Sequence, residues 1–134
     1  MNAAIGIEQL KKLPHFIIER RKNGTLFQNK MATHPDLMIQ EEIGNSSWFG
    51  FSLIIKPESK INRRILIEEL TGLGFETRPI VTGNFSKNDV MRFLDYKIPF
   101  KLQNAEYIDH NGLFVGNQHF PINEAIEEIS NLNI

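Results

Sequence analysis

The first thirty positions constrain the fold more than any other part of this sequence. From residue 2 to about residue 31, apolar side chains such as Leu10, Leu13 and Ile17 recur mostly at three- and four-residue intervals, with charged residues between them. This spacing predicts one amphipathic helix. Pro14 lies inside the pattern and removes a backbone donor, so the helix either kinks there or restarts with Pro14 in its first turn.

Two strands are predicted next. Residues 37–39 form a short apolar segment after a His-Pro-Asp breaker, and residues 48–56 are rich in aromatic and branched side chains and end before Pro57. The turn signal Gly-Asn-Ser-Ser at residues 44–47 separates the two segments. Because the connection is so short, the two strands are expected to pair with each other.

The remainder of the chain alternates between helix and strand signals. Ser86 is predicted to be the N-cap of a helix that runs to about residue 94, with Asp89 completing a capping-box-like pair. The other predicted elements are helix 60–73, strand 75–81, helix 102–110, strand 113–115 and helix 121–132. This order predicts an α/β fold in which a small, largely antiparallel sheet has helices packed on one face, all within a single domain, residues 1–134.

Composition excludes several classes of function. Fifteen basic and sixteen acidic residues give a net charge of −1, so electrostatic capture of nucleic acid has no support. The longest apolar runs, such as residues 51–55, are far shorter than the roughly 20 residues that cross a bilayer. The chain has no cysteine, which excludes disulfides and thiolate metal sites, and a cytoplasmic location without membrane contact is expected.

Histidines are the obvious candidates for ligating or titrating groups. His110 and His119 lie on either side of a predicted strand, and Asp109 adjoins the first, so these three residues are one hypothetical metal or acid–base set. The alternative is that they are surface or hydrogen-bonded residues, because no metal-ligand spacing such as HxH or HExxH is present.

Residues 76–85 carry the strongest hint of a binding site. Pro79 removes a ladder donor directly after Arg78, which places Arg78 on an edge or bulged strand and leaves it accessible. Its guanidinium suits a carboxylate or phosphate, although an ion pair with Glu76 is an equal alternative. Trp48 is the single tryptophan, and core packing is the more common use of this residue.

Several stretches together resemble a known family. The first fits the pattern AAIGxxQLxxL followed by two arginines, and the others are rich in glycine and aromatic residues. They are residues 2–13 with Arg20 and Arg21, residues 47–53, residues 74–81, residues 83–85, and Asp109 with residues 112–117 and His119. The chain resembles the DegT/DnrJ/StrS family of pyridoxal-phosphate-dependent sugar aminotransferases and dehydratases. It is most similar to the branch of NDP-4-keto-6-deoxyhexose 3-dehydratases of lipopolysaccharide synthesis.

The resemblance implies a C-terminal small domain of a fold-type I enzyme, equal to the last third of a family member. Pyridoxal or pyridoxamine phosphate would be held by a large domain outside these residues, so the chain alone is expected to bind no cofactor and to contribute no catalytic residue. The parent would be a 3-dehydratase or an aminotransferase acting on a nucleotide sugar. The substrate-facing residues would be Arg78, Asn84, Phe85, His119 and Trp48.

Two further expectations follow. If a large domain normally covers this chain, the isolated chain is expected to self-associate or to expose an apolar patch along the first helix. The competing interpretation is a freestanding, non-catalytic α/β module that binds a sugar nucleotide or a partner protein.

Overall fold

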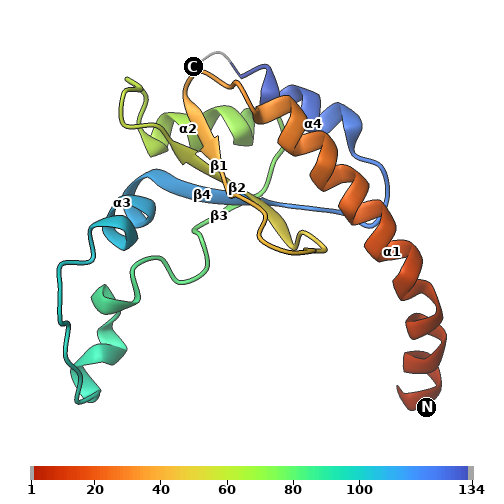
Figure 1. Ribbon diagram of the computed structural model, residues 1–134, viewed down its shortest axis with the longest axis horizontal. Helices are drawn as coiled ribbons and strands as arrows, with labels where there is room; N and C mark the ends of the chain where they lie inside the picture. The colour runs from red at the N-terminus through yellow and green to blue at the C-terminus, as the bar shows by residue number, and fades with distance from the viewer. Residues whose placement is uncertain (1, 133–134) are drawn as a thin grey trace.

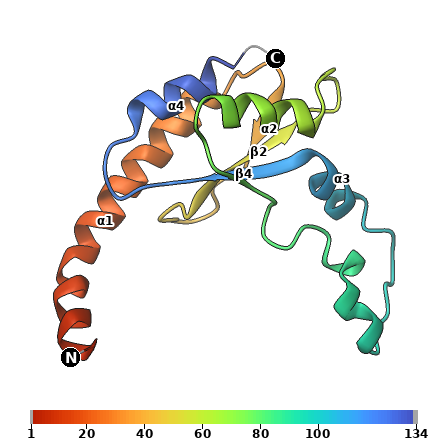
Figure 2. The ribbon, with the colours of Figure 1, turned by 180° about the vertical axis from the view of Figure 1, so that it is seen from behind.

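The computed structural model describes residues 2–132, which form a small sheet, helices packed against it, and two projecting arms (Figures 1 and 2). The elements in chain order are α1 Asn2–Met31, β1 Leu37–Ile39, β2 Gly50–Ile55, α2 Arg63–Gly72, β3 Thr77–Arg78, η1 Phe85–Lys87, η2 Asp89–Phe93, α3 Gln103–Asn111, β4 Gly112–Gly116 and α4 Asn123–Ser130. The predicted order of helices and strands is confirmed, except that the helix after β3 is replaced by two 3₁₀-helices.

The four strands form one antiparallel sheet in the order β1-β2-β4-β3. Leu37 of β1 pairs with Ile55 of β2, and Val115 of β4 lies between Phe51 of β2 and Thr77 of β3. This confirms the predicted small antiparallel sheet, in which the crossover from β2 to β4 leaves β3 at an edge.

The hydrophobic core lies on one face of this sheet. Alternation along β2 buries Phe51, Leu53 and Ile55, and helices α1, α2 and α4 cover them on the same side (Figure 1). Phe27 of α1 stacks on Phe51 with ring centroids 4.2 Å apart. The predicted packing of helices on one face is thereby confirmed for these three, while α3 binds the sheet through the Tyr107 hydroxyl, which donates to the Ile55 carbonyl at 2.7 Å.

The two halves of helix α1 differ in how they pack. It is continuous through Pro14, so it does not restart there, and its C-terminal half packs in the core. Its N-terminal half projects away from the sheet (Figure 2) and exposes Ile5, Ile7 and Leu10, which are 58%, 59% and 65% accessible. The exposed apolar residues expected along the first helix are therefore present. Within residues 2–132, no helix has both the length and the hydropathy needed to cross a membrane.

Asparagine side chains determine where several elements begin, and they correct two predictions. Asn62 caps α2 by accepting from the backbone of Arg64 and Ile65, so this helix starts at Arg63 and not at residue 60. Asn84 and Asn88 each cap a separate 3₁₀-helix, so the predicted α-helix with Ser86 as its N-cap is wrong.

Two predicted strands are shorter than expected for backbone reasons. Strand β3 covers only residues 77–78 of the predicted 75–81, because Pro79 has no N–H and Val81 adopts a φ of 52°. Strand β2 begins at Gly50 because Trp48, with a φ of 51°, turns the chain before pairing starts.

His34 is a buried polar residue for which the sequence held no signal. Its side chain is almost fully covered, and its Nδ1 accepts hydrogen bonds from the backbone N–H groups of Asp36 and Leu37 at 3.2 and 3.1 Å. Burial lowers the pKa of His34 below its ordinary value, because a charged imidazole is poorly solvated there. The folded protein therefore holds His34 in its neutral form.

The stability of the fold is expected to fall with acidification. Because the folded pKa of His34 is depressed, the unfolded chain binds more protons below about pH 6.5, and the free energy of unfolding decreases as the pH falls. Thermal melts at pH 8 and pH 5.5 measure this loss. The variant His34→Asn keeps an acceptor near the Nδ1 position without titrating, so its melting temperature should change less over the same interval. An equal change in both proteins would contradict the assignment.

Candidate functional site

Arg78 lies on the face of the sheet opposite the core. It pairs across the ladder with Phe114 of β4, and its side chain is largely exposed. Its Nε and Nη2 donate to the Glu76 carboxylate at 3.1 and 2.7 Å. The expected accessibility of Arg78 is confirmed, and the ion pair with Glu76, which was the alternative to ligand binding, is present. Since an exposed ion pair contributes only about 0.2–1 kcal/mol, an anionic ligand can displace Glu76 at little cost.

A hollow of about 440 Å³ lies beside Arg78. Its lining includes Arg20, Phe49, Phe114 and Asn117. Phe49 is 79% exposed, its ring lies 6.0 Å from that of Phe114, and the Arg20 guanidinium lies 6.0 Å from the Phe49 ring centroid. Two guanidinium groups beside two aromatic rings suit a ligand that combines an anionic group with a flat or apolar face.

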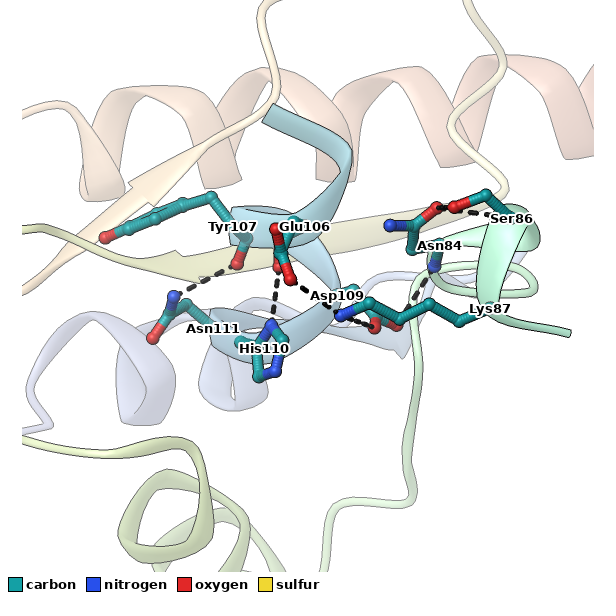
Figure 3. Close-up of polar contacts among 8 residues, drawn as sticks. All are labelled: Asn84, Ser86, Lys87, Glu106, Tyr107, Asp109, His110 and Asn111. Carbon is teal, nitrogen blue, oxygen red and sulfur yellow. Dashed lines mark hydrogen bonds and ion pairs between the residues drawn. The ribbon is translucent and has the colours of Figure 1, made fainter. Parts of the chain in front are cut away.

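Asn84 and Phe85 lie in a separate loop, next to α3 (Figure 3). Asn84 is buried, its backbone N–H donates to the Asp109 carboxylate at 3.0 Å, and its Oδ1 accepts from the Ser86 backbone and hydroxyl. Phe85 is half-exposed. Neither residue lines the hollow beside Arg78.

Trp48 and His119 occupy two further positions. Trp48 is buried against Phe51 and Gly24, where a Cβ on Gly24 would lie 2.6 Å from the indole. His119 is exposed and packs on Phe16 of α1 with ring centroids 4.3 Å apart. Together with Phe49 and Arg20 it lines a second hollow of about 240 Å³. The hollows beside Arg78 and His119 therefore share two residues, whereas Trp48, Asn84 and Phe85 line neither of them.

A polar network holds the shared residues in place. The Arg20 guanidinium donates to the carbonyls of Ser47 and Trp48, and Asn117 donates to the carbonyls of Arg20 and Trp48. Buried Asn23 donates to the Asn117 side chain at 3.1 Å and to the carbonyls of residues 118 and 120. Helix α1, the segment before β2 and the turn after β4 are thereby locked together. Sequence reasoning missed Asn23, because nothing in its local pattern marks it as buried.

The hypothetical set of Asp109, His110 and His119 is not assembled. Asp109 faces the loop of Asn84, and His110 contacts the Glu106 carbonyl through Nδ1 (Figure 3), while His119 packs on Phe16. Among residues 2–132, no three histidine, aspartate or glutamate side chains lie close enough to hold a metal ion. The alternative, hydrogen-bonded or surface histidines, describes these residues.

An antiparallel four-stranded sheet with helices on its core face and an aromatic, arginine-bearing opposite face defines the class: a mixed α/β domain like the C-terminal part of sugar-modifying pyridoxal phosphate enzymes. More specifically, the chain belongs to the DegT/DnrJ/EryC1/StrS aminotransferase family, whose model matches residues 1–131.

Within this family, the chain is similar to several 3-dehydratases of nucleotide sugars. The chain is 53% identical over 133 residues to a GDP-4-keto-6-deoxy-D-mannose 3-dehydratase of Yersinia pseudotuberculosis, covering 98% of this chain and 34% of that protein. A structure of the Escherichia coli enzyme of the same name, with bound hydrated PLP, aligns with a TM-score of 0.91 and 54% identity over 95% of this chain and 33% of its own. Another structure of a GDP-4-keto-6-deoxymannose 3-dehydratase holds GDP-perosamine.

More distant structures share the fold alone. The aminotransferase PseC of Helicobacter pylori aligns with a TM-score of 0.76 and 17% identity, over 95% of this chain and 34% of its own. In all these comparisons, the chain spans about a third of the length of the proteins that it matches.

The hollows on the described part of the chain do not fit pyridoxal phosphate. This cofactor is usually bound by a lysine or its substitute, a charged partner for the ring nitrogen and donors for the phosphate. The hollow that contains Lys101 has no carboxylate or arginine in its lining. The hollow that contains His119 has Arg20 but no carboxylate. The hollow beside Arg78 has arginines and Glu76 but no lysine or histidine.

The polar network is expected to contribute measurably to stability. Replacing Asn23 by alanine removes the side-chain donor to two carbonyls and one of the two donors to the Asn117 Oδ1, which also accepts from the Gln118 backbone N–H. This loss should lower the free energy of unfolding by about 1–3 kcal/mol. Asn29→Ala, at an exposed position of the same helix, is the matched control and should change stability by less than about 0.5 kcal/mol. Urea denaturation measures both. Equal effects would show that the buried amide is dispensable.

Proposed function

We propose that residues 1–134 form the C-terminal small domain of a nucleotide-sugar 3-dehydratase, and that this domain supplies substrate contacts and helps to close the active site. The observation that carries the proposal is the 53–54% identity to GDP-4-keto-6-deoxy-D-mannose 3-dehydratases over nearly the whole chain. Identity to the aminotransferase structure is 17%, which favours a dehydratase over an aminotransferase. The substrate would be a GDP-linked 4-keto-6-deoxy sugar.

In this proposal, another domain binds the cofactor and this chain binds part of the substrate. Pyridoxal or pyridoxamine phosphate would be held by another domain, since the hollows of this chain do not suit it. In this proposal Arg78 binds an anionic group of the substrate or of the amino donor, exchanging Glu76 for the ligand. The aromatic pair of Phe49 and Phe114 would offer it an apolar wall.

The other candidate contacts have weaker geometric support. His119 lies at the rim of the neighbouring hollow, next to Phe49. The half-exposed Phe85 and the buried Asn84 would reach the substrate from their own loop, and Trp48 would act mainly by supporting Phe49 from the core.

A chimera tests the proposal directly. The C-terminal third of the Escherichia coli dehydratase is replaced by this chain, and dehydration of GDP-4-keto-6-deoxy-D-mannose is followed with pyridoxal phosphate and glutamate present. Given the TM-score of 0.91, activity should remain within about tenfold of the parent enzyme, or about 1.4 kcal/mol of transition-state stabilisation. The equivalent third of the Helicobacter pylori aminotransferase is the control graft and should not support the reaction.

Two results would overturn this proposal. One is a chimera that folds and binds pyridoxal phosphate but does not turn over. The other is turnover by the chain alone. Binding of GDP-mannose by the isolated chain, together with an inactive chimera, would support the freestanding module instead.

Substitution of Arg78 examines its anion-binding role within the active chimera. Arg78→Ala removes a charge-assisted contact of about 1.5–3 kcal/mol, which should lower kcat/KM roughly 10- to 100-fold. Arg78→Lys should recover only part of the loss, because it lacks the planar fork. Glu76→Gln removes the competing carboxylate and should leave kcat/KM unchanged or raise it. Unaltered kinetics in Arg78→Ala would exclude this contact.

A further inference from the structure

The loop that carries Asn84 and Phe85 is held by carboxylates of α3, and one of them binds its backbone. The Asp109 Oδ1 accepts the Asn84 backbone N–H at 3.0 Å and also lies directly against Gly83, where a Cβ would approach it to 2.1 Å. Gly83 has a φ of 65°. The backbone conformation therefore favours glycine at this position, and a Cβ there would displace the Asp109 carboxylate.

A lysine completes this contact from the loop side. The Lys87 ammonium lies 3.1 Å from the Glu106 carboxylate and 3.7 Å from the Oδ2 of Asp109 (Figure 3). Its hydrogen bond and charge lower the pKa of Glu106. By distance, the Lys87 ammonium pairs with both carboxylates of α3. Asp109 is thus engaged at both oxygens, one by the loop backbone and the other by Lys87.

Helix α3 offers a firm platform for this loop. Tyr107 ties it to β2, and Gly112 joins it directly to β4. At Gly112 a Cβ would lie 2.6 Å from the Ile108 carbonyl and 2.7 Å from Ile80, so the end of the helix and the start of the loop are closely packed.

The chain after this loop has no comparable support. Residues 88–101 are exposed apart from the partly covered Met91, and they project from the body of the protein as an arm (Figures 1 and 2). The contacts of Asp109 are therefore placed where the arm and the loop leave the rigid sheet.

We propose that Asp109 is a positioning residue: its carboxylate, held by Lys87, fixes residues 83–87 on α3 and so sets where Asn84 and Phe85 stand toward the nucleotide sugar. The inference rests on the proposed function, because it takes these two residues to face substrate. Asp109 itself acts through the loop and does not touch the reacting atoms.

The first measurement needs only the isolated chain. Amide hydrogen exchange at Asn84 should accelerate at least about tenfold in Asp109→Ala, which loses the acceptor, and less in Asp109→Asn, which keeps one oxygen. Asp95→Ala, an exposed carboxylate on the arm, is the matched control and should leave this exchange unchanged. If Asp109→Ala fails to fold, Lys87→Met weakens the same contacts from the exposed side. Unchanged exchange in both variants overturns the proposal.

The second measurement uses the active chimera. Asp109→Ala should raise KM for the nucleotide sugar about tenfold while kcat changes less, and Asp109→Asn should restore part of the affinity. Faster exchange with unaltered KM and kcat would overturn the positioning role, because the loop would then lie away from the substrate. An inactive wild-type chimera would instead overturn the proposed function, and the exchange experiment would still decide whether Asp109 holds the loop.

Discussion

The stacking of Phe27 on Phe51 joins the first helix to the central strand, and the remaining structure depends on this contact. Both rings are essentially inaccessible, and burying one such ring contributes about 1.5–3 kcal/mol. Strand β2 pairs with β1 on one side and β4 on the other, so an error in the position of α1 would pass to three of the four strands. With one sheet face committed to this core, only the opposite face is free to meet a ligand.

Polar contacts connect the core to the residues on that free face and fix their backbone positions. Arg20 and Asn117 both donate to the carbonyl of the residue immediately before Phe49. The backbone at Phe49 is therefore held in place although its side chain is largely exposed. Asn23 extends the same network to the turn that bears His119. Asp109 has a similar role for the loop of Asn84: like Arg20, it is a charged side chain that binds backbone groups of a segment outside the strands.

The fold was largely predictable because it follows periodicity. Alternation in β2 and three- and four-residue spacing in α1 report directly which face is buried, and these elements were found with only small errors at their ends. The ends of the helices and strands, and the contacts of polar side chains, were harder to predict. The two 3₁₀-helices have Asn84 and Asn88 as their N-caps. In the sequence, Ser86 was an equally suitable N-cap, so the local pattern did not decide between these residues. Pro79 marked Arg78 as an accessible residue of an edge strand. Asn23 and Asn117, which bind each other, are 94 residues apart in the sequence, so no local pattern indicates their contact.

The distribution of exposed apolar side chains bears on the choice between a domain of a larger enzyme and a freestanding module. Most of the large exposed apolar residues fall in two places, the projecting half of α1 and the arm, where Leu10, Phe93 and Phe100 are 65%, 85% and 68% accessible. A monomeric module gains nothing from such surfaces and risks aggregation through them. A small domain that packs against a larger cofactor domain needs apolar surface of this kind. The two arms extend from the body on the side of the sheet opposite helices α2 and α4 (Figure 1), so a domain seated between them would cover that open face of the sheet. This arrangement favours a domain of a larger protein over the independent module.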